Sequence, residues 1–334
     1  MKIIVPMAGM GKRMRPHTLT IPKPLIPLAG KPIVHHLMED IVKVCPEKVD
    51  EIAFVIGRTF GKDVESQLVK IAESLGAKGT IHYQNEPLGT AHAILSAKPA
   101  LKGKVIVAFA DTLFRTDANI DADSDGTIWV KQIEDPRQFG VVKVDANNRI
   151  TDFVEKPQEF ISDLAIIGIY YFKDGENLCS ELQFLIDNNI KDKGEYQLTN
   201  AMENMKNKGK RLVPGKVIEW LDCGNKDATV YTNKRVLEIK YPGNKIAATA
   251  VSVNSVVIEP CYIDENVQLH NSIIGPHVTI GANSKIRNSV ITNSIIQNNS
   301  SVETACIDNS MVGSFVQYKG KPRDLSMGDY STEI

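Results

Sequence analysis

The chain has 334 residues, of which 43% are hydrophobic, so it holds enough apolar material for about two domains with real cores. Its formal net charge of −1 argues against a general nucleic-acid-binding protein, which needs a basic excess. No segment approaches the ~20 consecutive apolar residues that span a membrane, and the first apolar run, at residues 3–7, is too short for a secretion signal. We therefore expect a soluble, cytoplasmic protein with neither nucleic-acid nor membrane partners.

The first 240 residues alternate short apolar runs with segments of helical spacing. The apolar runs predict buried strands, at residues 2–6, 51–56, 81–84 and 105–110. Between these runs, apolar residues that recur at intervals of three and four predict helices, over residues 33–42, 64–75 and 90–97. This order of strand and helix predicts a mostly parallel sheet covered by helices on both faces.

The second part of this region is less regular. Residues 126–172 are richer in strand signals, and two helices are expected after them, at 178–186 and 197–206. A strand over 213–221 and a closing helix over 228–239 complete the pattern. We expect residues 1–240 to form one α/β domain, built on a Rossmann-like, doubly wound mixed sheet.

The composition changes after the turn at residues 241–244. Helical periodicity stops, and single aliphatic residues recur every five or six positions, at Ile263, Leu269, Ile274, Ile280, Ile286, Ile291, Ile296 and Val302. One inward aliphatic residue per side of each coil is the spacing of a prism-shaped β-solenoid, here of about four coils over residues 249–318. A β-sandwich is the alternative, but the strict alternation that it requires is absent. We expect a polar, loosely held tail over residues 319–334.

Two motifs near the N-terminus could carry chemistry. The first, at residues 9–16, follows the first strand and places two glycines beside three basic residues, which suits an anion-binding loop. It lacks the third glycine of a dinucleotide fingerprint and the spacing of a Walker A loop, and a plain turn is the alternative. In the second motif, at residues 21–27, prolines flank Lys23 and fix its backbone. A lysine held in this way can act as a stationary charge, although a stiff surface loop is the alternative reading.

These motifs, and others in the same order along about 220 residues, resemble the signature of the sugar-1-phosphate nucleotidyltransferase family. The further segments that carry the resemblance are 84–91, 109–111, 139–142, 154–157, 168–170, 194–199 and 220–224. The resemblance implies a nucleotidyltransferase (GT-A-like) sheet followed by a short left-handed parallel β-helix. The chain departs from the family pattern at Ala8, where a glycine is usual, and at Lys12, where threonine is frequent.

The resemblance also implies a reaction and a set of site residues. A sugar 1-phosphate oxygen would attack the α-phosphorus of a nucleoside triphosphate, and pyrophosphate would leave. Arg13, Lys23 and Lys156 would be catalytic, and Asp111 and Asp222 would hold Mg²⁺. The resemblance assigns nucleotide binding to Ala8, Gly9, Gly11, Lys12, Gln84, Gly89 and Thr90, and sugar-phosphate binding to Gly140, Glu155, Lys156 and Gly168.

Each of these residues also has a plainer interpretation. Asp111 could cap the element that follows its strand, and Asp222 could belong to an Asx turn. Glu155 and Lys156 could form an exposed ion pair that contributes little. The shared order of the motifs, rather than any one residue, therefore supports the assignment.

The sequence indicates the base and the sugar of the substrates less clearly than the class of reaction. The amide of Gln84 can pair with the imide edge of a pyrimidine, which favours dTTP or UTP. The family resemblance favours glucose 1-phosphate as the acceptor. The alternative within the family is guanylyl transfer to mannose 1-phosphate. Alternatives of other classes are a catalytically silent regulatory or assembly subunit and a β-helix acyltransferase that uses His270 or His277. Doubled aliphatic residues in the solenoid leave apolar surface that favours a homo-oligomer.

Overall fold

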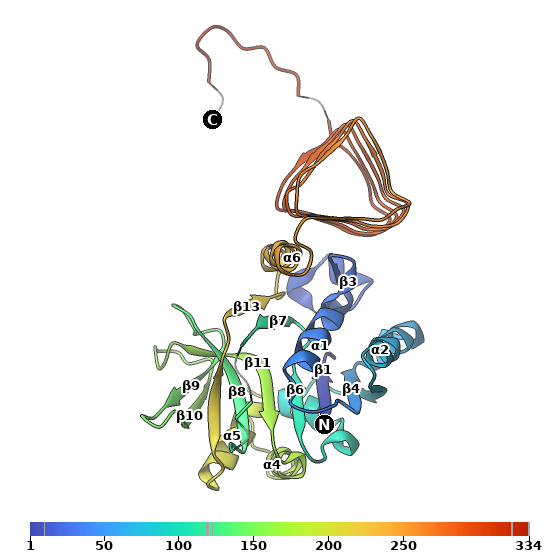
Figure 1. Cartoon of the computed structure of the whole chain (residues 1–334). Helices are drawn as coiled ribbons and strands as arrows, with labels where there is room; N and C mark the ends of the chain where they lie inside the picture. The colour runs from blue at the N-terminus through green and yellow to red at the C-terminus, as the bar shows by residue number, and fades with distance from the viewer. Residues whose placement is uncertain (10, 118–119, 122, 322, 333–334) are drawn as a thin grey trace. The chain divides into compact units, whose positions relative to one another are not determined.

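The computed structural model describes residues 1–9, 11–117, 120–121, 123–321 and 323–332 (Figure 1). Met10, which the first motif includes, and residues 322 and 333–334 of the expected tail lie outside the described residues. The chain divides into two compact units: the first comprises Met1–Ile26 and Pro32–Gly224, and the second Pro27–Lys31 and Asn225–Ile334. The expected boundary at residue 240 therefore lies within the second unit, which contains the closing helix.

The first unit is built on a mixed sheet, which confirms the predicted fold class. Its strands follow the order β10-β9-β11-β6-β1-β4-β5, and β8 pairs with both β11 and β12. β1 runs parallel to β4 and β6, whereas β11 runs antiparallel to β6, β8 and β9. The strands are β1 Lys2–Pro6, β4 Glu51–Ile56, β5 Lys78–Tyr83, β6 Val105–Ala108, β8 Gly126–Gln132, β9 Gly140–Val144, β10 Ile150–Glu155, β11 Leu164–Phe172 and β12 Leu212–Lys216.

Both faces of this sheet are covered at its centre, because successive residues of β1 and β4 point to opposite sides and nearly all are buried. Ile4 and Val55 belong to one core cluster with apolar residues of α3, α4 and α5, while Ile3, Val5 and Phe54 have the opposite parity and are fully buried as well. The α-helices of this unit are α1 Ile33–Val44, α2 Lys62–Ser74, α3 Thr90–Leu95, α4 Gly175–Asp187 and α5 Leu198–Asn207. Short 3₁₀ turns are η1 Lys12–Met14, η2 His17–Leu19, η3 Lys23–Leu25, η4 Arg58–Phe60 and η5 Lys98–Ala100.

The single strand predicted over residues 213–221 is wrong. The chain forms β12 over Leu212–Lys216, which runs parallel to β8, and then β13 over Glu219–Asp222, which runs antiparallel to β7 over Thr112–Arg115. Pro214, Gly215 and Lys216 interrupt the apolar residues of this segment, but nothing local in the sequence indicates that the second part pairs with β7. The separate β7–β13 ribbon joins segments about 110 residues apart, and this pairing positions part of the site.

The second unit contains a triangular parallel β-helix, and the alternative of a β-sandwich is wrong (Figure 1). Each side of the prism is one parallel sheet, and all eight aliphatic residues that predicted the solenoid are buried to at least 99%. The three sheets have the orders β14-β17-β20-β23-β26, β15-β18-β21-β24-β27 and β16-β19-β22-β25. Their strands are β14 Asn244–Ile246, β15 Val251–Val253, β16 Val256–Val257, β17 Cys261–Ile263, β18 Gln268–His270, β19 Ile273–Ile274, β20 Val278–Ile280, β21 Lys285–Arg287, β22 Val290–Ile291, β23 Ile295–Ile296, β24 Ser301–Glu303, β25 Cys306–Ile307, β26 Met311–Val312 and β27 Gln317–Lys319.

Asparagines make the corners between these short strands. Asn254, Asn271 and Asn288 adopt positive φ, a backbone region that asparagine tolerates better than most residues. Their side chains also form a hydrogen-bonded ladder from coil to coil, at 3.4 Å and 3.1 Å. The frequent asparagines of this region therefore turn the chain at each coil and tie neighbouring coils together.

Helix α6, Lys226–Lys240, belongs to the same unit as the β-helix because a buried residue of the helix bonds to it. Asn233 is fully buried, and its Oδ1 accepts hydrogen bonds from the Thr279 hydroxyl at 2.7 Å and the Ala29 amide at 3.2 Å. Ala29 lies between the short strands β2 Pro27–Leu28 and β3 Lys31–Pro32, where the Tyr262 ring packs against Gly30. These contacts group α6 and residues 27–31 with the β-helix.

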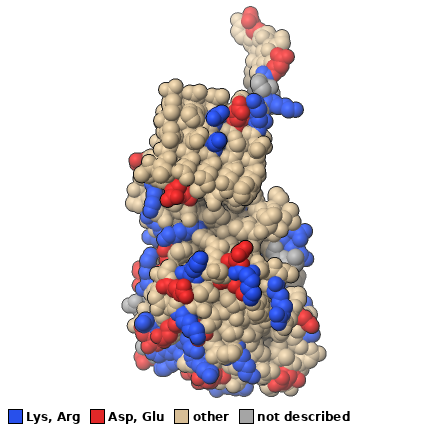
Figure 2. All heavy atoms as spheres, turned by 90° about the vertical axis from the view of Figure 1, so that its right-hand side faces the viewer, with Lys and Arg blue, Asp and Glu red and all other residues tan. Residues whose placement is uncertain are grey.

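The surface of the protein carries charges of both signs. On the face shown in Figure 2, acidic and basic side chains alternate over the first unit, and the coils of the β-helix show few charges. Within the described part of the chain, no helix is both long and apolar enough to cross a membrane. The described residues of the tail, 320–321 and 323–332, form no helix or strand.

Candidate active site

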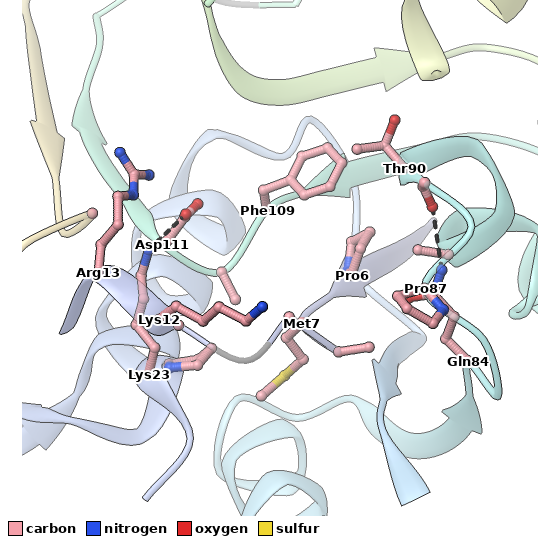
Figure 3. A pocket seen from close by; sticks show the side chains of 18 of the residues that line it. Pro6, Met7, Lys12, Arg13, Lys23, Gln84, Pro87, Thr90, Phe109 and Asp111 are labelled. Carbon is pink, nitrogen blue, oxygen red and sulfur yellow. Dashed lines mark hydrogen bonds and ion pairs between the residues drawn. The ribbon is translucent and has the colours of Figure 1, made fainter. Parts of the chain in front are cut away.

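A pocket of about 450 Å³ opens in the first unit, beside the carboxyl ends of the parallel strands β1, β5 and β6 (Figure 3). Open α/β sheets commonly bind ligands at this edge. Ten of the residues predicted to act on the nucleotide or its phosphates line it: Ala8, Gly9, Gly11, Lys12, Arg13, Lys23, Gln84, Gly89, Thr90 and Asp111. Pro6, Met7, Pro24, Pro87, Ala93, Phe109, Ala110, Glu195 and Gly224 complete the lining.

Charged side chains gather at one end of this pocket (Figure 3). The Lys23 ammonium donates a hydrogen bond to Asp111 Oδ2 at 2.7 Å, and the lysine is only 7% exposed. Its backbone enters the turn η3 between Pro22 and Pro24, as the proline spacing predicts. Gly11 adopts a φ of 56° directly above it, and a Cβ at Gly11 would lie 3.0 Å from the Lys23 Cβ. The glycine therefore allows the N-terminal loop to close over the lysine.

The second predicted metal ligand reaches the same end through the β7–β13 ribbon. Asp222 pairs with Thr112 in the register of the two strands, and the next residue, Cys223, donates its amide to the Asp111 carbonyl at 2.9 Å. Burial, together with the nearby charge of Asp111, raises the pKa of Asp222 above its ordinary value. The two aspartates therefore repel each other in a partly buried place.

Arg13 approaches this group of charges from the N-terminal loop. A Cβ at Gly224 would lie 2.7 Å from Asp222 Oδ2 and 3.2 Å from Arg13 Nη2, so the absence of a side chain at Gly224 lets the arginine and the aspartate meet there. Lys12 and Arg13 are exposed and line the pocket, unlike the buried Lys23. The arrangement offers two exposed cations and one buried cation beside two carboxylates.

The opposite end of the pocket carries Gln84, Pro87 and Thr90 (Figure 3). Gln84 Nε2 donates to the Gly89 carbonyl at 3.2 Å and lies 3.2 Å from Nδ1 of His92. Within the described part of the chain, the Gln84 carbonyl oxygen accepts no hydrogen bond, so it can accept one from a ligand. Glu195 also lines the pocket and lies next to Gly89, so this end carries one carboxylate, whereas the other end carries the cations Lys12, Arg13 and Lys23.

A segment that we call the strap, residues 192–199, holds the loop at this end. The Tyr196 amide donates to the Leu88 carbonyl, and the Tyr196 carbonyl accepts from Ala91, each at 2.9 Å. The Thr90 hydroxyl donates to Gln197 at 3.1 Å and accepts from the Leu198 amide at 2.9 Å. Both hydroxyl bonds of Thr90 thus go to the strap, which fixes the loop around Gln84.

Gly89→Ala is expected to destabilise this junction. Gly89 has a φ of 116°, and a Cβ would lie 2.5 Å from the Tyr196 carbonyl oxygen and 2.7 Å from its nitrogen. Gly76→Ala is the control, because Gly76 also has positive φ but nothing lies within 4 Å of its Cβ position. We expect urea unfolding to show a loss of about 1 kcal/mol for Gly76→Ala and at least about 1 kcal/mol more for Gly89→Ala. Equal losses of unfolding free energy for the two variants would show that the strap moves away from the added Cβ without an energetic penalty.

The four residues predicted to bind the sugar phosphate do not line this pocket but gather beside it. Glu155 pairs with Gly140 across β9 and β10, and a Cβ at Gly140 would lie 3.1 Å from the Glu155 carboxylate. Gly168 accepts a hydrogen bond from the Phe109 amide at 2.9 Å, and Phe109 lines the pocket. Lys156 is exposed, and its ammonium lies 3.7 Å from Glu155.

Buried Tyr170 connects these residues to the charged end of the pocket. Burial raises the pKa of the Tyr170 phenol far above its ordinary value, and the nearby carboxylates of Glu155 and Asp111 raise it further. Its ring packs edge-to-face on Phe109, with centroids 6.2 Å apart. The structure thus brings the expected sugar-phosphate residues close to the expected metal ligands.

Sequence reasoning missed several residues of this region. Phe109 and Glu195 line the pocket, and both stand inside segments that carried the family resemblance, so the motifs themselves were the available signal. Lys193 was not singled out, and it lies one residue before the segment 194–199. Among the described residues, no group of three or more His, Cys, Asp or Glu side chains could hold a metal by itself.

A sequence model of the family described as "Nucleotidyl transferase" matches residues 2–239, about 70% of the chain. The chain belongs to the nucleotidyl transferase family. The match contains every residue of the pocket. This nucleotidyl transferase is also 27% identical to the low-salt glycan biosynthesis nucleotidyltransferase Agl11 of Haloferax volcanii, over 99% of both chains. It is 29% identical to a glucose-1-phosphate thymidylyltransferase of Streptomyces antibioticus, over 95% of this chain and 93% of that protein.

A solved structure supports the fold of this nucleotidyl transferase. A putative glucose-1-phosphate thymidylyltransferase from Bacillus anthracis superposes with a TM-score of 0.60, at 23% identity, and covers 72% of this chain and 97% of its own. The α/β unit is therefore a fold already seen among proteins with that name.

Proposed function

We propose that the protein transfers a nucleotidyl group from a pyrimidine nucleoside triphosphate, dTTP or UTP, to glucose 1-phosphate in a Mg²⁺-dependent reaction. The observation that carries this proposal is the polarity of the pocket. Lys23, Arg13 and Asp111 line one end, with Asp222 next to it, and the amide of Gln84, whose carbonyl oxygen can accept a hydrogen bond, lies at the other end. A nucleoside triphosphate has the same polarity, with a charged phosphate chain at one end and a planar base at the other.

The chemical difficulty is the approach of two anions, and positive charge at fixed positions relieves it. A phosphate oxygen of the sugar attacks the α-phosphorus, the bond to the bridging oxygen breaks, and pyrophosphate leaves. Lys23 is held by two prolines and by burial, so it would act as a fixed charge at the α-phosphate. Arg13 is exposed and can present its planar fork to the leaving phosphates. Lys156, beside Glu155, would hold the incoming sugar phosphate.

The aspartates fit a divalent cation. Asp111 and Asp222 are hard oxygen donors, and Mg²⁺ is usually bound by one or two carboxylates together with substrate phosphates. Burial and the nearby charge of Asp111 raise the pKa of Asp222, and a bound divalent cation would offset both effects. When bound, the ion would neutralise phosphate charge and orient the triphosphate.

Gln84 supports the choice of a pyrimidine. The imide edge of uracil or thymine offers one N–H donor flanked by carbonyl acceptors. The Gln84 carbonyl oxygen can accept from that N–H, while the amide group that bonds Gly89 holds the side chain in place. Thymidylyl transfer is also the activity named for one relative along nearly the whole chain. The name of the same relative supports glucose 1-phosphate as the acceptor. Guanylyl transfer to mannose 1-phosphate is the alternative.

A grid of substrates tests the proposal. Pyrophosphate release is measured with Mg²⁺ for four triphosphates, dTTP, UTP, GTP and ATP, each against glucose, mannose and N-acetylglucosamine 1-phosphates. We expect release only with dTTP or UTP, and fastest with glucose 1-phosphate. Release confined to GTP and mannose 1-phosphate would establish the alternative. If no combination of substrates releases pyrophosphate, a catalytically silent subunit would be favoured. Consumption of acetyl-coenzyme A would then be measured to test the alternative of a β-helix acyltransferase.

We further propose that the second unit assembles the protein into a homo-oligomer. Val256, Ile273 and Val290 occupy the same register on successive coils of the sheet β16-β19-β22-β25 and point outward, with 57%, 42% and 39% of their surface exposed. Aligned aliphatic side chains on a flat face form a strip that a second copy of the same strip can cover.

Ile273→Lys is therefore expected to reduce the molar mass of the particle in light scattering, because a charge in the strip would lose its water on association. Gln268→Lys on the neighbouring sheet is the control and should leave the mass unchanged. A wild-type protein that is monomeric at micromolar concentration would contradict the proposal.

A further inference from the structure

Lys193 forms two hydrogen bonds that the proposed reaction does not explain. Its ammonium donates to the backbone carbonyl of Lys156 at 2.8 Å and to that of Glu155 at 3.1 Å. Both residues belong to the set of four that is expected to bind the sugar phosphate. Lys193 itself lies 37 residues further along the chain, at the tip of a turn in the strap.

The turn that presents Lys193 is strained. Asp192 and Glu195 exchange backbone hydrogen bonds at 2.9 and 3.0 Å, which leaves Lys193 and Gly194 as the two central residues. Both have positive φ, 50° and 85°, as two-residue hairpin turns of this kind require. Glycine adopts this conformation freely, whereas a lysine there costs about 1–2 kcal/mol. Glycine would fit this position without strain, so the presence of lysine suggests that its side chain has a function there.

Lys156 is strained in the same way. Its φ is 44°, its amide donates to the Phe139 carbonyl at 3.1 Å, and its carbonyl is the one that Lys193 binds. The peptide groups on both sides of Lys156 are thus fixed from two directions. With its backbone held, the side chain of Lys156 has fewer positions to search than that of an ordinary exposed lysine.

We propose that Lys193 is a positioning residue that holds the backbone of Lys156 so that its ammonium is aimed at the phosphate of the incoming sugar. This inference rests on the proposed role of Lys156 in the transferase reaction. Lys193 acts through the two carbonyls and does not contact the substrate. The strap that carries it also fixes the loop around Gln84, so one segment supports the residues of both substrates.

Kinetics of single and double variants test this proposal. For Lys193→Met we expect the KM for sugar 1-phosphate to rise about tenfold, the size of one charge-assisted hydrogen bond, with the KM for the triphosphate unchanged. Lys193→Arg should restore the wild-type KM to within about threefold, because a guanidinium can also donate to both carbonyls. Lys191→Met is the matched control: it removes the same charge two residues away, where the ammonium lies over the Tyr196 ring at 4.9 Å, and it should leave both KM values unchanged.

A double-variant cycle separates positioning from direct contact. If Lys193 acts only through Lys156, adding Lys193→Met to Lys156→Met should change the KM for sugar 1-phosphate by less than about twofold. A further tenfold rise in that background would overturn the proposal, because it would show that Lys193 touches the phosphate itself. An unchanged KM for Lys193→Met alone would overturn it as well. If Lys156→Met has no effect, the proposed role of Lys156 fails instead, and the two failures are therefore distinguishable.

Discussion

Asp222→Asn is expected to lower kcat by on the order of 10²-fold or more while leaving the folded protein at least as stable as the wild type. The two effects have opposite signs because the charge of Asp222 would hold Mg²⁺ in the proposed reaction but is unfavourable for folding. Burial and the nearby charge of Asp111 raise the pKa of Asp222, so the folded state disfavours the ionised carboxylate. Asparagine has nearly the same shape without that charge, but it is a much poorer ligand for Mg²⁺.

The measurements are steady-state pyrophosphate release and thermal unfolding in the presence of a chelator. Asp187→Asn at the exposed end of α4 is the control, and it should change neither quantity by much. A variant that loses stability and activity in parallel would assign Asp222 to the turn between β13 and α6 rather than to a metal ion. Full wild-type activity in excess chelator would remove Mg²⁺ from the account altogether.

Arg13→Ala is expected to reduce kcat/KM by about 10²-fold, close to 3 kcal/mol of transition-state stabilisation, with little change in the midpoint of thermal unfolding. Arg13 is exposed, so its removal leaves no cavity, and the half-buried Asp222 beside it keeps the nearby charge of Lys23. Arg15→Ala is the matched control, since Arg15 is an exposed arginine of the same loop that does not line the pocket. An equal loss of activity for both arginines would indicate a general effect of charge rather than a fork aimed at the phosphates.

Lys23, unlike Arg13, is expected to contribute to the stability of the fold, and its motif did not predict this difference. A lysine between prolines in a polar loop is expected to support no core, yet Lys23 is buried and paired with Asp111. Its partner lies 88 residues away in the sequence, so only the folded chain shows the pairing. Lys23→Met is therefore expected to damage stability as well as turnover, because it leaves Asp111 without its buried counter-charge.

Separation along the sequence also explains which parts of the fold could be predicted: local patterns could be recognised, and pairings between distant segments could not. The β-helix could be predicted because each coil repeats one inward aliphatic residue per side, and the repeat is local in sequence. The antiparallel ribbon β7–β13 could not, because its two strands lie about 110 residues apart and nothing local in the sequence indicates that they pair. That ribbon is also what brings Asp111 and Asp222 together.

The residues of the candidate site also divide into those that the sequence predicts and those that only the structure shows. Family motifs located the pocket residues of the N-terminal loop and of segment 84–91, since each motif is continuous in sequence. Lys193 escaped notice because its contacts depend on a positive φ at two separate lysines, and no pattern of residue types encodes that conformation. Residues that act through backbone carbonyls leave little trace in a sequence.

The central claim, that this pocket performs nucleotidyl transfer, is tested most directly by following the α-phosphorus. The protein is incubated with Mg²⁺, glucose 1-phosphate and dTTP labelled at the α-phosphate, and Arg13→Ala is treated in parallel. We expect the label to enter a nucleotide sugar while unlabelled pyrophosphate is released in equal amount, and Arg13→Ala to form this product about 10²-fold more slowly. Label that stays in the triphosphate, or that appears only in free nucleotide, would contradict it.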